Sequence, residues 1–327
     1  MSSYFRVTHF SEVIHAHQGL RTAPGTFADP IDTVPIMTNT APAKSSNATT
    51  VELRSIVSQV RRDIVRMVHA CQSGHPGGSL GCADFFTALY FHVLRHDPKH
   101  FTMDGISEDL FFLSNGHISP VFYSVLARNG YFPVDELKTF RKLNSRLQGH
   151  PTTHEGLPGV RMASGSLGQG MSVGIGAALA KKLNEDPTLV FTLHGDGELQ
   201  EGQIWEAAIA AAGKKVDNLI STVDWNGRQI DGDVDDVMPL GDLHAKWTAF
   251  GWDVMEMQGN DMDAVLAGLA EAISRTGKGK PVMILMHTEM GSGVDFMEGS
   301  HEWHGIAPND AQLAAALKQL PETLGDY

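Results

Sequence analysis

HGDGE, at residues 194–198, closes a short β-rich run that begins at Thr188. A stretch of helical composition follows, and a second apolar run, residues 219–223, leads directly into DWNG at residues 224–227. Two neighbouring parallel strands would therefore each end in an oxygen-bearing side chain at the carboxyl edge of a sheet, where open α/β sheets bind ligands. The spacing predicts an α/β fold with a ligand site at that edge.

The residues of these two turns suit a metal-bound diphosphate. Glycines 195 and 197 let the backbone approach a phosphate closely, and the helix start that follows offers N–H groups and the positive end of a dipole. The Asp196 carboxylate and the Asn226 amide oxygen are hard ligands of the kind that Mg²⁺ or Ca²⁺ prefers. Aspartate is equally suited to capping a helix, and that simpler role is the alternative for Asp196.

This combination resembles the thiamine-diphosphate-binding motif, and further segments resemble transketolases in content and order. The segments are SGHPGG (73–78), LSNGH (113–117), GHP (149–151), GSLGQG (165–170) and HEWHG (301–305). The similarity extends from Val51 to about Pro308. It implies the thiamine-diphosphate-binding fold, with a parallel sheet and helices on both faces, and specifically its diphosphate-binding domain.

The resemblance also assigns residues to the cofactor and its metal. The metal, Mg²⁺ with Ca²⁺ or Mn²⁺ as alternatives, would be held by Asp196, Asn226 and the backbone carbonyl of Arg228. The Arg228 guanidinium must then point away from the ion. The loop at 165–167 would contact the aminopyrimidine of thiamine diphosphate, with Leu167 packed beneath it. The expected cofactor-binding residues are Gly165, Leu167, Gly195, Asp196, Gly197, Glu198, Asn226, His117, Glu201 and Glu206.

Histidines are numerous, at 16 in the chain, and several lie in the transketolase-like segments. By resemblance, the expected catalytic residues are His75, His117, His150 and His301. Imidazoles suit ketol transfer because protons must move on and off sugar hydroxyls near neutral pH. His304 is expected to be structural. Zinc is the alternative ligand for histidine clusters, but the sequence has no local ligand pair at the usual helical spacing.

Glu201 and Glu206 lie on the helix predicted after the GDG turn. In transketolases two glutamates there belong to an acidic network that links the two active sites of a dimer. The alternative is that both are ordinary solvated residues that complement the helix dipole.

The chain length suggests that half of the site is supplied from elsewhere. In transketolases a glutamate of a second, pyrimidine-binding domain must hydrogen-bond the cofactor, and this chain ends at Tyr327 without room for that domain. The resemblance therefore implies the N-terminal subunit of a split transketolase, active only with a separate C-terminal pyrimidine-binding subunit, in an α₂β₂ assembly. The alternatives are a pathway-specific or deoxyxylulose-phosphate synthase-like subunit, and a non-catalytic homologue.

Composition bounds the partners of the chain. A net charge of −13 over 327 residues argues against binding to nucleic acid or to an anionic membrane, because no basic excess is present. Sugars or sugar phosphates are the expected substrates. Two cysteines, Cys71 and Cys82, are too few for a disulfide framework and indicate a reducing cytoplasm.

Hydrophobic periodicity places the elements and divides the chain. Residues 1–50 are expected to be a disordered extension, with Met37 as an alternative start, residues 51–308 the cofactor domain, and residues 309–327 a helical tail. Strands are predicted at 188–193, 219–224, 252–257 and 282–287. Helices are predicted at 51–70, 79–94, 119–129, 134–143, 169–183, 201–212, 241–249, 261–274 and 310–319.

Overall fold

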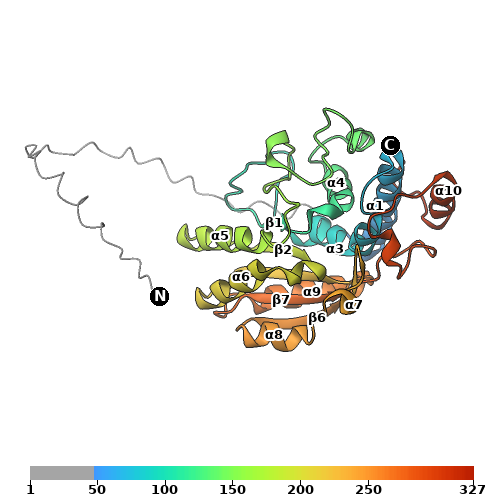
Figure 1. The fold of residues 1–327 in the computed structure, drawn as a ribbon. Helices are drawn as coiled ribbons and strands as arrows, with labels where there is room; N and C mark the ends of the chain where they lie inside the picture. Colours follow the sequence, from blue (N-terminus) through green and yellow to red (C-terminus); the bar gives the residue numbers. More distant parts are fainter. Residues whose placement is uncertain (1–47) are drawn as a thin grey trace, which may run out of the picture. The chain divides into compact units, whose positions relative to one another are not determined.

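A sheet of five parallel strands lies at the centre of the computed structural model, which describes residues 48–327 (Figure 1). In spatial order the strands are β1 (Leu110–Leu113), β2 (Val190–Gly195), β3 (Leu219–Trp225), β7 (Val282–His287) and β6 (Asp253–Gln258). Each neighbouring pair is parallel. A separate hairpin pairs β4 (Arg228–Gln229) with β5 (Gly232–Asp233). The predicted α/β fold class is confirmed.

Helices cover both faces of the sheet, and two apolar clusters fill the spaces between (Figure 1). Side chains alternate between the faces along each strand. In β1, Phe111 and Leu113 join the cluster with α1, α3, α4 and α9, whereas Leu110 and Phe112 join the cluster with α5, α6 and α8. The helices are α1 (Thr50–Cys71), α2 (Pro76–Gly81), α3 (Ala83–Ala88), α4 (Ser119–Arg128), α5 (Gly170–Leu183), α6 (Gly202–Gly213), α7 (Val234–Val237), α8 (Leu243–Ala249), α9 (Met262–Arg275) and α10 (Asp310–Gln319).

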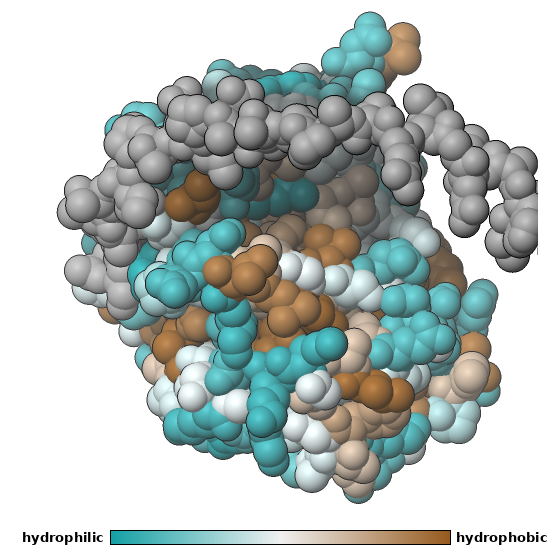
Figure 2. All heavy atoms as spheres, turned by 90° about the vertical axis from the view of Figure 1, so that its left-hand side faces the viewer, coloured by the Kyte–Doolittle hydropathy of each residue, from teal (hydrophilic) through white to brown (hydrophobic). Residues whose placement is uncertain are grey.

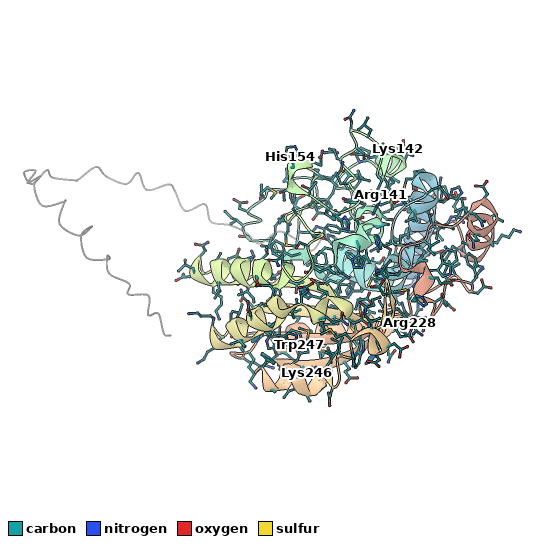
Figure 3. All side chains as sticks on the ribbon, in the orientation of Figure 1. Arg141, Lys142, His154, Arg228, Lys246 and Trp247 are labelled. Carbon is teal, nitrogen blue, oxygen red and sulfur yellow. The ribbon has the colours of Figure 1, made fainter. Side chains whose placement is uncertain are left out.

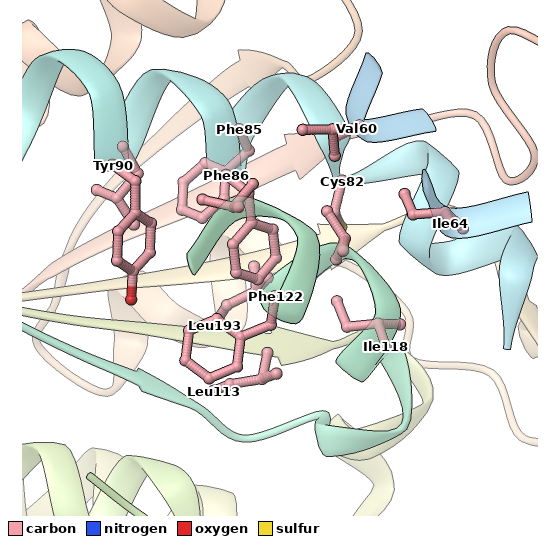
Figure 4. Packing of buried hydrophobic residues seen from close by; sticks show 14 of the residues in the cluster. Val60, Ile64, Cys82, Phe85, Phe86, Tyr90, Leu113, Ile118, Phe122 and Leu193 are labelled. Atoms are coloured by element: carbon pink, nitrogen blue, oxygen red, sulfur yellow. The ribbon is translucent and has the colours of Figure 1, made fainter. Parts of the chain in front are cut away.

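Aromatic side chains dominate the first cluster (Figure 4). Phe86 of α3 and Phe122 of α4 are almost fully buried, with ring centroids 6.0 Å apart, and both pack against Phe111 of the sheet. Truncating a buried phenylalanine to alanine typically costs about 3–5 kcal/mol. This packing holds α4, and the loop that precedes it, against the carboxyl edge of β1.

The predicted strands and most predicted helices lie close to the observed ones, but β1 is absent from the sequence prediction. Its four residues are all buried, so they show none of the alternation that marks a half-exposed strand. Hairpin β4–β5 and the short α7 are likewise absent from it. The helix predicted at 134–143 is a 3₁₀ helix at Val134–Thr139, because Arg141 and Asn144 adopt positive φ angles of 57° and 61°.

The helix predicted at 79–94 is three pieces. α2 begins earlier, at Pro76, since proline is tolerated in the first helical turn. The helix is interrupted at Cys82, and the last piece, Leu89–Val93, is a π-helix. At Gly81 a side chain would lie 2.9 Å from the carbonyl oxygen of Glu289, so glycine at this position lets the chain after β7 pack closely on α2.

Residues 1–47 lie outside the described part of the chain, so most of the predicted disordered extension, 1–50, and the alternative start at Met37 concern residues that the structure does not describe. At its end, Thr49 caps α1, which begins at Thr50. The tail predicted at 309–327 contains α10, which packs against α1. Among residues 48–327, no helix has the length and apolar character needed to cross a bilayer.

The C-terminal segment is held to α1 by charged hydrogen bonds. Asp326 accepts from Arg62 Nη2 at 2.6 Å and from Gln59 Nε2 at 3.0 Å. Arg66 donates to the backbone carbonyl of Tyr327 at 2.5 Å and lies 4.2 Å from the centre of its ring. The hydrogen bond from Arg62 lowers the pKa of Asp326 to about 2, against the opposing effect of burial.

We predict that Asp326→Asn lowers the melting temperature at pH 7, by an amount equivalent to about 0.5–1 kcal/mol for a partly exposed ion pair. The folded-state pKa lies below the unfolded value, so this stabilisation is present above about pH 4 and is lost as the pH falls towards 2. Calorimetric melting of both proteins between pH 7 and 3 measures it, with Asp104→Asn at an exposed site as control. A difference that grew at low pH would contradict the assignment.

Candidate active site

The carboxyl ends of β1, β2 and β3 deliver their loops to one cavity of about 290 Å³. Gly195 lies opposite Asp224 in the register of β2 and β3, so the GDG turn sits beside the DWNG turn as predicted. The cavity is lined by His75, Gly78, Asn115, His117, His150, Gly165, Leu167, Gly195, Asp196, Gly197, Glu198, Asp224, Asn226, Arg228, Gln229, Ile230, Met290 and His304.

Two aspartates are buried side by side in the wall of the cavity. Asp196 and Asp224 are each 2% exposed, and neither pairs with a basic side chain of residues 48–327. Burial, together with the charge of Asp224, raises the pKa of Asp196 to about 7. Two carboxylates in a low-dielectric site favour a bound cation. The chemistry of the site therefore fits the divalent ion that the sequence predicts.

Asp224 orients Asn226, a metal ligand in the sequence prediction. Asn226 Nδ2 donates to Asp224 Oδ2 at 2.9 Å, so Oδ1, which accepts from the Arg228 N–H, is the amide atom that can also act as a ligand. Asp224 also accepts from the hydroxyl of Thr288 and from the thiol of Cys82. Reasoning from the sequence missed Asp224, although a polar residue at the end of an apolar strand, two positions before a ligand, is a usable signal.

The guanidinium of Arg228 points away from the metal site, as expected. It forms an ion pair with Asp233 across hairpin β4–β5, while its backbone N–H donates to Asn226 Oδ1 at 2.9 Å. Within residues 48–327, no three His, Cys, Asp or Glu side chains are grouped to hold a metal. The remaining ligands of an ion at Asp196 would therefore be the Asn226 amide, a backbone carbonyl and oxygens of a bound diphosphate.

The rings of three histidines from distant parts of the chain lie close together in the same cavity. The ring of His75 lies 5.1 Å from that of His117 and 5.5 Å from that of His304, and 5.1 Å separates His117 from His304. His150 lies farther out, 6.3 Å from His75, on the exposed side. Glycine at position 77 permits this meeting, since a side chain there would lie 2.6 Å from Met290 and 2.9 Å from the Trp303 carbonyl.

The cluster is held neutral near pH 7. Burial and the charges of His304, Arg141 and His150 lower the pKa of His75 to about 4. Burial is also the main cause of lowered pKa values at His117, His150 and His304. Among residues 48–327, the Nδ1 atoms of His75 and His304 are buried without a hydrogen-bond partner. Neutral imidazoles with free ring nitrogens can exchange protons with a hydroxyl group of a ligand.

The prediction that His301 belongs to this cluster is wrong, and His304 takes that place. His301 is exposed and does not line the cavity. Both histidines lie in a single 3₁₀ turn, His301–His304, which the buried Trp303 anchors against Phe296. The orientation of so short a turn is set by that anchor, and spacing in the sequence does not reveal it.

Other predicted residues divide between the cavity and the surface. Gly165 and Leu167 line the cavity, as expected for the loop before α5. Glu201 and Glu206 do not, and both are exposed at the start of α6. Their assignment to the cofactor site and to an acidic network between two copies of the chain therefore stays a prediction. Ile230 and Met290 are apolar lining residues that the sequence analysis did not single out. Figure 3 labels Arg141, which follows the 3₁₀ helix Val134–Thr139, and Arg228 of β4.

Comparison with known proteins agrees with this geometry. Residues 53–323 match the family model described as transketolase, thiamine diphosphate binding domain. The chain belongs to the transketolase family. It is 38% identical over 275 residues to an apulose-4-phosphate transketolase subunit of Phocaeicola vulgatus, covering 84% of this chain and 95% of that relative. It is 37% identical to the 6-deoxy-6-sulfo-D-fructose transketolase subunit SqwG of Clostridium sp., covering 83% and 96%.

The fold matches solved transketolases over part of their length. The transketolase from Leishmania mexicana aligns with a TM-score of 0.76 and 29% identity, covering 85% of this chain. This transketolase-family chain spans 42% of the length of that protein. It corresponds in extent to the relatives that are named as transketolase subunits, so the predicted family and the predicted thiamine-diphosphate-binding fold are both confirmed.

We predict that Asp196→Ala abolishes metal-dependent binding of thiamine diphosphate while the chain stays folded. The diphosphate would lose its bridging ion, and Arg228, which is paired with Asp233, is not free to replace it. Calorimetric titration with thiamine diphosphate and MgCl₂ measures this, with Asp104→Ala at an exposed site as control. Unchanged affinity in Asp196→Ala would refute the metal assignment.

Proposed function

We propose that this chain is the cofactor-binding subunit of a split, thiamine-diphosphate-dependent transketolase. The assembled enzyme would move a two-carbon ketol unit from a ketose or ketose phosphate to an aldose or aldose phosphate. The observation that carries the proposal is one cavity lined both by a buried acid pair and by neutral histidines. The relatives named as transketolase subunits, of nearly the same extent, support the split arrangement.

Each part of the cavity has a role in this proposal. Asp196, Asn226 and the Arg228 carbonyl would hold Mg²⁺, with Ca²⁺ or Mn²⁺ as alternatives, and the ion would hold the diphosphate. Thiamine diphosphate, when bound, supplies the carbanion chemistry. Ile230, Met290 and Leu167 supply apolar surface for its rings and exclude water.

The histidines would handle protons of the sugar. His75 and His304 line the cavity, each with a buried Nδ1 atom that has no hydrogen-bond partner within residues 48–327, and His117 lies against both rings. Because these imidazoles are neutral near pH 7, they can accept a proton from a donor hydroxyl and return it to the acceptor. His150, more exposed, would contact the part of the sugar nearer the mouth of the cavity.

Relatives act on different ketoses by their names, apulose 4-phosphate and 6-deoxy-6-sulfo-D-fructose. A pathway-specific donor is therefore the second candidate within the same chemistry, ahead of a deoxyxylulose-phosphate synthase-like reaction. A non-catalytic role is disfavoured, because unpaired buried carboxylates and orphaned imidazole nitrogens are costly unless a ligand uses them. A panel of ketose donors, assayed with the partner subunit present, separates these cases.

A pyrimidine-binding partner subunit would complete the site. Three apolar side chains are exposed, Ile230 to 58% and Ile306 and Met238 to 54% each. Ile230 lines the cavity itself, so a chain docked at Ile230 would contact the cofactor. We propose that the partner subunit covers this surface and supplies the glutamate that the cofactor requires.

A second copy of this chain would pack on α5 and α6. Val173 of α5 and Ile209 of α6 are 39% and 61% exposed, and the exposed Glu201 and Glu206 lie on the same pair of contacting helices. Apolar residues also gather among hydrophilic ones on the face shown in Figure 2. We propose an α₂β₂ enzyme in which the two glutamates lie between the copies. A cytoplasmic location is also proposed, supported by the free thiols of Cys71 and Cys82.

We predict that His304→Ala lowers ketol transfer by about 10²–10⁴-fold, the usual contribution of a general acid–base residue. His301→Ala, three positions away on the surface, should retain the wild-type rate. Steady-state kinetics of the assembled enzyme measure both, and cofactor titration checks that binding is unchanged. Equal loss in the two variants would contradict the placement of His304 in the cavity.

We also predict that the isolated chain is inactive and assembles with its partner into a heterotetramer. Obligate interfaces commonly bury more than roughly 2,000 Å² and adopt closed symmetry. Sedimentation of the chain with and without the product of a neighbouring reading frame gives the stoichiometry. Robust transketolase activity from the isolated, homogeneous chain would refute the split enzyme.

A further inference from the structure

Three loops of the cavity meet at one buried carboxylate, that of Glu198. Glu198 is 2% exposed and lies in the 3₁₀ turn Gly197–Gln200 that follows the GDG turn. One oxygen accepts from the Ser114 hydroxyl and from the Gly168 backbone N–H at 2.7 Å. The other accepts from the Gly195 N–H at 3.1 Å. The side chain thus joins the loop after β1, the loop before α5 and the end of β2.

Ser114 extends this contact to α5. Its hydroxyl oxygen accepts from the backbone N–H of Gly170, the first residue of α5, at 3.0 Å. A side chain at position 170 would lie 2.4 Å from Ser114 Cβ, so the helix start and the loop after β1 approach as closely as glycine allows. Gly168 has a φ of +86°, which only glycine adopts without strain. The segment that carries Leu167 is therefore fixed on its C-terminal side, at Gly168 and Gly170.

The negative charge of Glu198 has no direct role in the proposed chemistry. The nearest basic atom in residues 48–327 is His194 Nδ1, at 3.7 Å, and no lysine or arginine pairs with the carboxylate. A negative charge in the wall of a cavity that receives a diphosphate repels that ligand. What the carboxylate supplies instead is three hydrogen bonds, from the Ser114 hydroxyl and from two backbone N–H groups, and charge-assisted bonds are the stronger kind.

We propose that Glu198 is a positioning residue that holds the three loops in their cofactor-binding arrangement before the cofactor or the partner subunit binds. This inference rests on the proposed function for the identity of the ligand, though not for the loop contacts. Fixing the loops in advance reduces the ordering cost that binding would otherwise incur. Gly165 and Leu167, which line the cavity, are placed by a segment that ends at the Glu198 contact.

Amide hydrogen exchange of the full chain, without any ligand, tests the loop contacts directly. In the wild type the Gly168 and Gly170 amides should be protected. Glu198→Ala should speed their exchange by about 10- to 100-fold, as expected for losing a hydrogen bond to a charged group. Glu198→Asp should resemble Glu198→Ala because its carboxylate is one methylene short, whereas Glu198→Gln retains the reach and one acceptor oxygen and should restore most of the protection.

Controls separate positioning from general destabilisation. Amides of α9, on the opposite face of the sheet, should exchange at unchanged rates in every variant. Glu185→Gln, at an exposed site, should leave the Gly168 amide at its wild-type rate. If Glu198→Ala does not fold, Ser114→Ala removes one link and should free Gly170 alone. Unchanged exchange at Gly168 in Glu198→Ala, or equal acceleration in α9, would overturn the inference.

Titration with thiamine diphosphate and MgCl₂ connects the contacts to binding. Glu198→Ala and Glu198→Asp should bind at least about tenfold more weakly than the wild type, and Glu198→Gln should lie close to it. Tight binding by Glu198→Ala would overturn the inference even if exchange changed. If the wild-type chain bound no cofactor with or without its partner, the proposed function would fail, while the exchange result would still decide the role of Glu198 in the loops.

Discussion

The burial of two carboxylates at the carboxyl edge of the sheet is the constraint on which the site depends. Asp196 and Asp224 stand on adjacent strands whose register places Gly195 opposite Asp224. Unpaired charges in such a position are unfavourable, so the surroundings must supply donors or a cation. Backbone N–H groups of Gly197 and Gly227 donate to Asp196, at 2.7 and 2.6 Å, and Asn226 donates to Asp224. These hydrogen bonds fix the conformation of the GDG and DWNG turns.

The histidine cluster that lines the same cavity responds to burial in a different way. Three separate segments of the chain supply His75, His117 and His304, whose rings lie close together. Their burial removes the water that would be needed to stabilise three imidazolium ions. Their neutrality is a consequence of burial and of mutual repulsion, to which Arg141 adds. The two groups therefore favour opposite surroundings: the buried acids favour a nearby cation, whereas the histidines favour the absence of any further positive charge. In the proposed function, a metal-bound diphosphate would lie at the acids and a neutral, hydroxyl-rich sugar would lie at the histidines.

The fold is consistent with the proposal that a partner subunit completes the site. The sheet is covered by helices on both faces, and its two apolar clusters need no further chain. The lining of the cavity, in contrast, includes Ile230, an apolar residue that is 58% exposed. The apolar core of the described residues thus lies within this chain, whereas in the proposed function the surface around the cavity would be covered by the partner subunit.

The sequence by itself determined what depends on neighbours along the chain. The GDG and DWNG turns, the apolar strands that precede them and the long amphipathic helices are local patterns, and from them the fold class, Asp196 and Asn226 could be predicted. Only the tertiary structure decided which of His301 and His304 faces the cavity, because Trp303 fixes the turn between them by packing. It also decided the break at Cys82 and the existence of β1, whose residues are buried on both sides. The contacts of Glu198 with Ser114 and Gly168 join residues 84 and 30 positions apart. Contacts over such separations are set by how helices and sheet pack in space, and no spacing within a single sequence specifies that packing.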